Sequence, residues 1–395
     1  MPGNESPNKL IDPDRLVFLA ILLIPINMTI SGLILITLLF KTIKLKTNQL
    51  VPEKIKNLFY LFLIYSLIQG LFTYNPVYHY AGLIGHYIIY LLFFNILSKI
   101  IDNKEKLNQL INSVISSGSI LAISGIIIFL LSDIDLKFIP YNLFEAKGYL
   151  IDLDTKLYAG RASGISMNPN ILAIYLVISL IFTLNKLNIS KQWLSSFIIF
   201  FLQILCLFFS YSRGAVLAFF VTLPFLLKNI SRKFSYITVS IPLIIILINP
   251  YFIDRLIKTL DFNHNLDNSR IFVWQKTLEI ISDNWQGIGI LSFENLYRIY
   301  NYENYKHIPH AHNWFLQTTA ESGIIGAIIF FTFFSFIIYY FAKNLKKEDK
   351  YITLSLLAFI IFNLADYVLT DTRITLIMTA VIFIGFFKIN KSKMD

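Results

Sequence analysis

Long apolar runs recur along almost the whole chain, and they decide what it can fold into. Runs of roughly membrane-spanning length lie at residues 16–40, 56–74, 79–101, 111–132, 168–185, 193–211, 214–228, 235–250, 323–342, 351–369 and 372–388. A helix needs about 17–25 apolar residues to cross a hydrocarbon core. With 56% hydrophobic and 15% charged residues, the chain has too little polar surface to cover a soluble particle of 395 residues. We therefore expect an all-α polytopic membrane protein with about 12 transmembrane helices, forming one membrane domain over residues 1–395.

The number of spans in the first run is ambiguous, and two polar stretches interrupt the series of spans. Pro25 and Asn27 interrupt residues 16–40, so this run is either one kinked span or a tight hairpin of two short helices. Residues 133–167 and 251–322 are too polar to span a membrane. We expect them to be two loops outside the membrane.

Lysines gather in alternate loops. Six segments hold 20 of the 34 Lys and Arg residues, namely 41–57, 99–107, 186–191, 228–233, 343–350 and 388–393. By the positive-inside rule these segments face the cytoplasm, and both long loops then lie on the outer face. The net charge of +10 therefore reflects orientation and contact with anionic membrane lipids, and it does not indicate nucleic-acid binding.

Arginines show the opposite distribution. Of the eight, only Arg232 falls in a lysine-rich segment, and six fall on the outer side: Arg161, Arg213, Arg255, Arg270, Arg298 and Arg373. A guanidinium group binds phosphate in a bidentate manner, whereas lysine acts as a point charge. This distribution predicts a phosphate-bearing ligand at the outer leaflet. The alternative, strongest for Arg255 and Arg298, is that the side chain reaches toward lipid headgroups.

Arg213 lies within Tyr211-Ser212-Arg213-Gly214-Ala215, where one apolar run ends at the outer face and the next begins. A charge this close to hydrocarbon is costly unless it is paired or faces a polar cavity, which favours a functional role. The competing explanation is a turn residue that points at headgroups.

A second motif consists of Gly160–Gly164 followed by Asn168-Pro169-Asn170. Here we expect Arg161 to be a weaker ligand candidate and Asn170 to line a cavity. Helix capping explains the asparagines equally well.

Arg270 opens a segment in which Ile271, Trp274, Leu278 and Ile281 share one face. This spacing predicts an amphipathic helix on or near the outer leaflet, capped by Asn268 or Ser269. Arg270 then stands at a helix N-terminus, where free N–H groups already favour an anion. A plain exposed arginine in the first turn is the competing explanation.

Three histidines, His307, His310 and His312, precede the apolar run that starts at residue 323. A shared metal ion is one interpretation, but no carboxylate or thiol stands at a suitable spacing and Pro309 breaks any regular helix. We therefore predict no metal site and expect one histidine, His312, to accept a proton. The neighbouring Asn313 is expected to bind the acceptor or fix the turn. Glu321 either orients an arginine or is a simple helix-terminus acid.

Two further histidines are expected to have no functional role. His86 falls inside an apolar run and is expected to be a core histidine. His79 is expected to be solvated.

The order of these motifs resembles the bacterial O-antigen ligase and O-antigen polymerase superfamily. The matching pieces are Arg161-x-Ser-Gly with Asn168-Pro-Asn, Ser212-Arg213-Gly214, Arg270 followed by Trp274, Gly287-Ile-Gly289 before Phe293, and His312-Asn313 followed by Glu321-x-Gly323 and Gly326. The resemblance covers roughly residues 160–330 by motif, and the whole chain by its expected topology.

This resemblance implies a GT-C-like glycosyltransferase in the bacterial inner (plasma) membrane, with no cofactor and no metal. It would move a glycan from undecaprenyl diphosphate to an acceptor hydroxyl on a lipid A-core sugar, with inversion, at the periplasmic face. Residues 251–322 would then be a large periplasmic loop. Arg213 and Arg270 would neutralise the diphosphate and His312 would be the general base. Arg161, Asn170, Asn313 and Glu321 would bind substrate.

Three alternative functions are also considered from the sequence. A polymerase would use the same site but accept another lipid-linked glycan chain. A protein O-glycosyltransferase would need a groove for a polypeptide. A small-solute transporter would need ionisable residues distributed through the spans, and here these are few, with His86 and Asp366 the clear cases.

Overall fold

The computed structural model describes residues 12–130, 137–138, 151–152, 160–166, 168–189, 193–228, 232–248, 253, 270–301 and 308–392. This part of the chain is almost entirely helical, and its strands β1 (Lys137–Phe138) and β2 (Ile151–Asp152) form a short antiparallel pair. The α-helices are α1 (Pro13–Leu23), α2 (Met28–Thr42), α3 (Glu53–Gln69), α4 (Pro76–Leu83), α5 (Ile89–Ile100), α6 (Lys104–Leu130), α7 (Pro169–Ile189), α8 (Trp193–Phe209), α9 (Arg213–Leu227), α10 (Arg232–Leu247), α12 (Arg270–Asp283), α13 (Phe293–Tyr300), α14 (Trp314–Asn344), α15 (Tyr351–Asn363) and α16 (Thr372–Lys391). Short helical turns occur at Ile84–Ile88 (π), Gly164–Ser166 and Lys347–Asp349 (both 3-10).

Five helices within the described residues are long and apolar enough to cross a membrane. They are Pro76–Ile100 (α4, the π turn and α5), Lys104–Leu130, Pro169–Leu187, Trp314–Asn344 and Thr372–Lys391. Four shorter apolar helices accompany them, at Met28–Thr42, Trp193–Phe209, Arg213–Leu227 and Ser235–Leu247. The chain is thus a polytopic helical membrane protein, as the sequence predicts. The count of about 12 spans and the GT-C-like arrangement stay predictions.

The first apolar run, residues 16–40, forms the hairpin of two short helices. Asn27 caps α2 by accepting a hydrogen bond from the Ile30 N–H at 3.0 Å. The buried hydroxyl of Ser31 on α2 donates to the carbonyl oxygen of Ala20 on α1 at 2.9 Å. This contact holds the two helices side by side, so the kinked single span is excluded.

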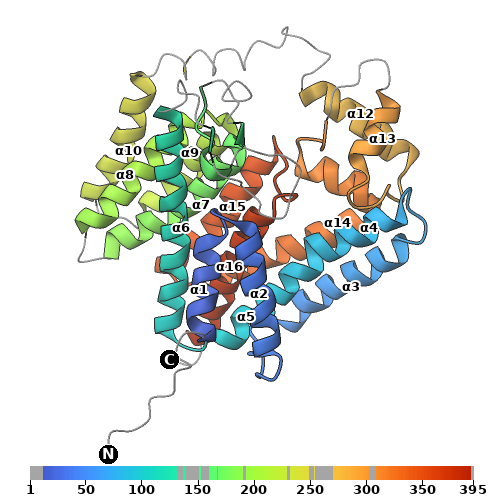
Figure 1. Cartoon of the computed structure of the whole chain (residues 1–395), viewed down its shortest axis with the longest axis horizontal. Coiled ribbons are helices and arrows are strands. Elements are labelled where there is room, and N and C mark those ends of the chain that lie inside the picture. The colour runs from blue at the N-terminus through green and yellow to red at the C-terminus, as the bar shows by residue number, and fades with distance from the viewer. Residues whose placement is uncertain are drawn as a thin grey trace, which may run out of the picture.

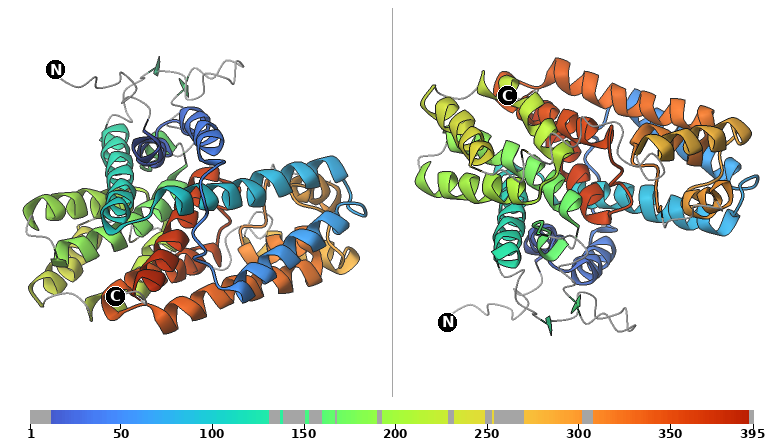
Figure 2. Two further views of the ribbon diagram at one scale, coloured as in Figure 1. Left: turned by 90° about the horizontal axis from the view of Figure 1, so that it is seen from below. Right: turned by 90° about the horizontal axis from the view of Figure 1, so that it is seen from above.

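Several lysine-bearing loops meet at one end of the helices. Lys388 pairs with Asp349 at 3.0 Å, which joins the end of α16 to segment 343–350. The Asn390 side chain donates to the Leu50 carbonyl oxygen at 2.7 Å, which joins the same end to segment 41–57. In Figure 1 the end of α16 lies near the bottom of the view, while α12 and α13 lie near the top. Figure 2 shows the helices along two further directions.

Helix α14 departs from helical geometry at Gly323, where φ is 69° and ψ is 172°. The break frees the carbonyl oxygens of Ala320 and Glu321, which accept hydrogen bonds from the N–H groups of Ile288 and Gly289 at 2.9 Å each. The turn between α12 and α13 is thereby docked into α14. The helix begins at Trp314, earlier than the apolar run at 323 suggests, so the last part of segment 251–322 belongs to α14.

Helix α12 is described from Arg270 onward, and it packs on a different face from the one predicted. Its buried residues are Val273, Thr277 and Ile280. Ile271 and Leu278, from the expected apolar face, are 43% and 55% exposed. The helix therefore has one face against the protein and a second apolar face turned outward, where lipid can contact it. The expected caps, Asn268 and Ser269, lie outside the described residues.

Candidate active site

Three arginines from distant segments line one small polar cavity of about 60 Å³. Arg161 precedes α7, Arg213 is the first residue of α9 and Arg270 is the first residue of α12. Asn170, in the first turn of α7, and Asp366, between α15 and α16, line the same cavity. The fold thus gathers four residues selected from the sequence around one carboxylate.

Arg161 is held against the turn between α8 and α9. Its Nε donates to the Ser210 carbonyl oxygen at 2.8 Å, and its Nη2 donates to Asn170 Oδ1 at 2.9 Å. Tyr211 in this turn has a φ of 49°, a left-handed conformation that is strained for any residue but glycine. Such strain persists where the surroundings enforce it, often at functional sites. The turn presents Arg213 to the cavity that Arg161 also lines.

Asp366 connects the cavity to the histidines. Its Oδ2 accepts a hydrogen bond from Asn170 Nδ2 at 2.8 Å and lies 3.8 Å from Arg270 Nη2. Its Oδ1 lies 3.1 Å from His312 Nδ1. The residue is only 5% exposed, and burial acts to raise the pKa of this carboxyl. The hydrogen bond with His312 and the charge of Arg270 outweigh burial and lower the pKa to about 2, so Asp366 is a carboxylate at neutral pH.

Sequence reasoning did not select Asp366 as a site residue. The available signal was an acid inside the apolar run 351–369, which is costly in a membrane unless it is paired. That run does not continue as helix, because α15 ends at Asn363. The turn that follows carries Asp366 to the arginines and to His312.

His312 lies directly before the cap of α14 and has a φ of 50°. Asn313 is the N-cap, accepting from the Leu316 N–H at 3.0 Å and donating to the Leu364 carbonyl oxygen at 2.8 Å. Asn313 therefore fixes the turn that carries Asp366. Because a carboxylate can only accept, His312 Nδ1 carries the proton and Nε2 is the basic nitrogen of the neutral ring.

His310 packs against His312, with ring centroids 4.3 Å apart. Its Nδ1 accepts a hydrogen bond from the His312 backbone N–H at 3.3 Å. Burial is the main cause that lowers the pKa of His310, to about 4, and a proton on His312 would act in the same direction, so the His310 ring is neutral at neutral pH. His307 lies outside the described residues.

The structure overturns one argument against a metal ion. His310, His312 and Asp366 each offer a ligand atom, and these atoms lie within 4.8 Å of one another. No carboxylate stands at a suitable spacing in the sequence, but the fold brings one to the histidines from the turn after α15. Two imidazoles and a carboxylate can bind zinc. The absence of a metal site stays a prediction that metal removal must test.

Glu321 lies apart from the residues that line the arginine cavity. Its Oε1 accepts hydrogen bonds from the Leu291 N–H at 3.0 Å and from Gln317 Nε2 at 2.9 Å. The side chain is buried at the break in α14. These contacts give no support to the expectation that Glu321 orients an arginine, and they indicate that it holds the 291 turn.

Of the two isolated histidines, His79 contradicts its expectation and His86 departs from it only in part. His79 is fully buried, with Nε2 2.7 Å from the Ser66 carbonyl oxygen and Nδ1 accepting from the Ile290 N–H at 3.2 Å. The expectation that it is solvated is wrong, since it joins α4 to the loop before α13. His86, expected in the core, is only partly buried and lines a larger cavity.

A family model described as O-antigen ligase matches residues 198–331, from within α8 to within α14. This segment is similar in sequence to O-antigen ligases. The match confirms the resemblance to the O-antigen ligase and polymerase superfamily and includes Arg213, Arg270 and His312. Asp366, with Arg161 and Asn170, lies outside the matched segment. No curated protein matches the chain.

Proposed function

We propose that this chain is a glycosyltransferase of the ligase type. It moves a glycan from undecaprenyl diphosphate to an acceptor hydroxyl, on a lipid A-core sugar, at the periplasmic face of the bacterial inner membrane. The observation that carries the proposal is the position of the His312–Asp366 pair beside a cavity lined by three arginines. The proposed general base, His312, then lies next to the proposed binding site of the diphosphate leaving group.

The arginines suit the leaving group. Negative charge builds on the diphosphate as the glycosidic bond breaks, and fixed cations at that point lower the barrier. Arg213 and Arg270 bind the diphosphate, while Arg161 and Asn170 line the same cavity. Arg270 is the first described residue of α12, and if the helix also starts there, its backbone N–H groups would favour the same anion.

His312 suits the acceptor. Its Nε2 takes the proton of the acceptor hydroxyl while that oxygen attacks the anomeric carbon. The bond from this carbon to the diphosphate oxygen breaks, and the diphosphate leaves with the electron pair, so the configuration inverts. Asp366 holds the imidazole through Nδ1 and stabilises the imidazolium that forms. Asn313 positions both groups.

The proposed reaction needs no metal ion, because the arginines supply the positive charge. Glycan transfer by the purified protein in millimolar EDTA tests this directly. Unchanged transfer supports the proposal. Loss of transfer that a divalent ion restores would make His310, His312 and Asp366 a metal site.

Deletion of the gene separates the ligase from its nearest alternative. A ligase-deficient cell accumulates full-length glycan that is not attached to its acceptor. A cell deficient in the polymerase, which would use the same site, attaches glycan shortened to one repeat. Purified protein with lipid-linked donor and acceptor then tests the enzyme itself, and absence of transfer with either acceptor would favour a transporter.

A further inference from the structure

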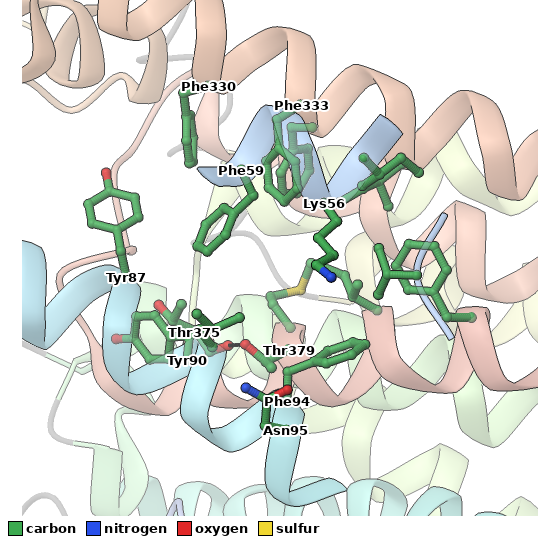
Figure 3. Close-up of a pocket in the computed structure, with 18 of the residues that line it drawn as sticks. Lys56, Phe59, Tyr87, Tyr90, Phe94, Asn95, Phe330, Phe333, Thr375 and Thr379 are labelled. Atoms are coloured by element: carbon green, nitrogen blue, oxygen red, sulfur yellow. Dashed lines mark hydrogen bonds between the residues drawn. The ribbon is translucent and has the colours of Figure 1, made fainter. Parts of the chain in front are cut away.

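A second and larger cavity lies between α3, α5, α14 and α16. Its volume is about 710 Å³, within the range of roughly 300–1,000 Å³ that ligand sites occupy. In Figure 3, Phe330 and Phe333 of α14 face it from one side, and Phe94 of α5 and Thr379 of α16 face it from the other. None of the residues that line the arginine cavity lines this one.

The lining changes in character from one end to the other. Most of the wall is aromatic or aliphatic, with the polar side chains of His86, Asn95, Thr375 and Thr379 among them, and one end reaches Trp314 and Tyr367. The other end is polar and is formed by Thr47, Asn48, Gln49, Glu53 and Lys56. A long apolar interior with a polar, charged mouth is the shape and chemistry of a site for a lipid chain with its headgroup.

The mouth belongs to the lysine-bearing end of the protein. Leu50, which lines it, is bonded to Asn390 at the end of α16. Segment 41–57 carries five lysines and a single acid, Glu53. Lys56 extends from α3 across the cavity toward α5 and α16 (Figure 3). A headgroup at this mouth is therefore favoured if it is anionic, and Lys56 is its nearest fixed cation.

We propose that this cavity binds an acyl chain of an anionic phospholipid from the cytoplasmic leaflet, with the lipid phosphate beside Lys56. The tail of the lipid-linked donor fits less well. Its diphosphate would lie at Arg213 and Arg270, so its chain would have to enter from the opposite end. Lys56 would then have no anionic group to bind.

Photochemical labelling tests the site in the full-length protein reconstituted in phosphatidylcholine nanodiscs. The probe is phosphatidylglycerol with a photoreactive group in one acyl chain. We expect labelled peptides from α14 around Phe330–Ile337 and from α16 around Met378–Ile382. Lys56→Glu should weaken labelling at least about fivefold, because each lysine near a membrane surface contributes about 1 kcal/mol to anionic-lipid binding and the new carboxylate also repels the phosphate.

Two further variants test whether labelling depends on the position of Lys56 and on the open cavity. Lys54→Glu changes the same net charge on the same helix, but Lys54 is exposed and is not part of the cavity lining. It should weaken labelling much less than Lys56→Glu. Thr379→Phe fills the cavity without a charge change and should abolish labelling, with thermal unfolding measured to show that the protein is folded.

Three outcomes would overturn the proposal. One is equal labelling by photoreactive phosphatidylglycerol and phosphatidylcholine, and another is labelling that Lys56→Glu leaves unchanged. The third is preferential labelling by a photoreactive polyprenyl phosphate, which would assign the cavity to the donor tail. Labelling needs no turnover, so the test stands apart from the proposed glycan transfer, which is measured on the same variants.

Discussion

At the scale of single residues, one carboxylate organises the candidate site. Asp366 contacts Asn170, Arg270 and His312, which belong to three different segments. A buried carboxylate is stable only if such partners replace its lost hydration. The arginines could be selected from local sequence, since each marks a turn or a helix start. Asp366 could not, because its contacts join positions 196 and 54 residues apart.

The base is the first residue-scale prediction. General-base catalysis is worth roughly 10²–10⁴-fold, so His312→Ala should lose activity by about that factor. Donor binding should be retained, because the arginines are unchanged. His310→Ala is the matched control and should be milder, since His310 is neutral and accepts only a backbone hydrogen bond. Full transfer by His312→Ala in an assay with purified lipid-linked donor would remove His312 from the mechanism.

The leaving-group arginines give the second prediction. Arg213→Lys and Arg270→Lys keep the charge but lose the bidentate geometry that a diphosphate needs. Each should reduce turnover by on the order of 100-fold or more. Arg298→Lys serves as the control, because Arg298 lies on α13 and does not line the arginine cavity. Wild-type turnover in both cavity variants would contradict the assignment.

His310 and Asp366 give a prediction about pH. Between about pH 6.5 and 4 the unfolded chain protonates His310 while the folded protein does not, so acidification through this window lowers the free energy of unfolding. The stabilisation from Asp366, whose pKa falls from 3.8 to about 2, stays constant through this window and is lost only as the pH falls from 3.8 toward 2. Thermal unfolding of His310→Gln should therefore depend less steeply on pH between 6.5 and 4. An unchanged slope would show that His310 is not buried as a neutral ring.

At the scale of elements, the break in α14 determines where the outer segments sit. The turn between α12 and α13 is bonded into this break, and Gln69 of α3 donates to the Glu321 carbonyl oxygen at 2.9 Å. Helix α14 begins at Trp314, just after His312. The break in α14 therefore contacts the segment that follows α12, while the start of the same helix positions His312. We infer that the break places Arg270 and His312 relative to each other.

Gly323 tests this inference. A Cβ at this position would lie 2.4 Å from backbone atoms of Gln286, and its φ of 69° with ψ of 172° is open to glycine almost alone. Gly323→Ala should lower thermal stability and reduce glycan transfer. Gly32→Ala is the matched control, because a Cβ there meets nothing within 4 Å and alanine stabilises a helix by about 1 kcal/mol relative to glycine. Equal stability of the two variants would show that the break is not needed.

Most helices could be predicted because apolar runs of spanning length have a direct physical cause in the bilayer. Helix α14 was predicted short, since residues 314–322 contain too many polar groups to read as an apolar run. The buried face of α12 was predicted wrongly for a related reason. A helix between protein and lipid has two apolar sides, and periodicity does not say which side meets the protein.

At the scale of the whole molecule, lysines and arginines lie in different places. The lysine-bearing segments at one end are joined by the Lys388–Asp349 ion pair and by the hydrogen bond from Asn390 to the Leu50 carbonyl oxygen. Arginines gather around Asp366 in a cavity that none of those loops lines. The clustered lysines agree with the positive-inside rule, and the arginines suit recognition of an anion because of their rigid guanidinium groups.

The orientation itself is the last prediction. In a Cys206→Ser background, an added thiol at Asn295 of α13 should react with a membrane-impermeant reagent in cells whose outer membrane is permeabilised. A thiol at Lys346 should react only after the inner membrane is opened, because the positive-inside rule predicts that its loop faces the cytoplasm. Both positions are exposed, so access depends on sidedness and not on burial. The reverse pattern would place the arginines and His312 in the cytoplasm, and no periplasmic glycan transfer could then occur at this site.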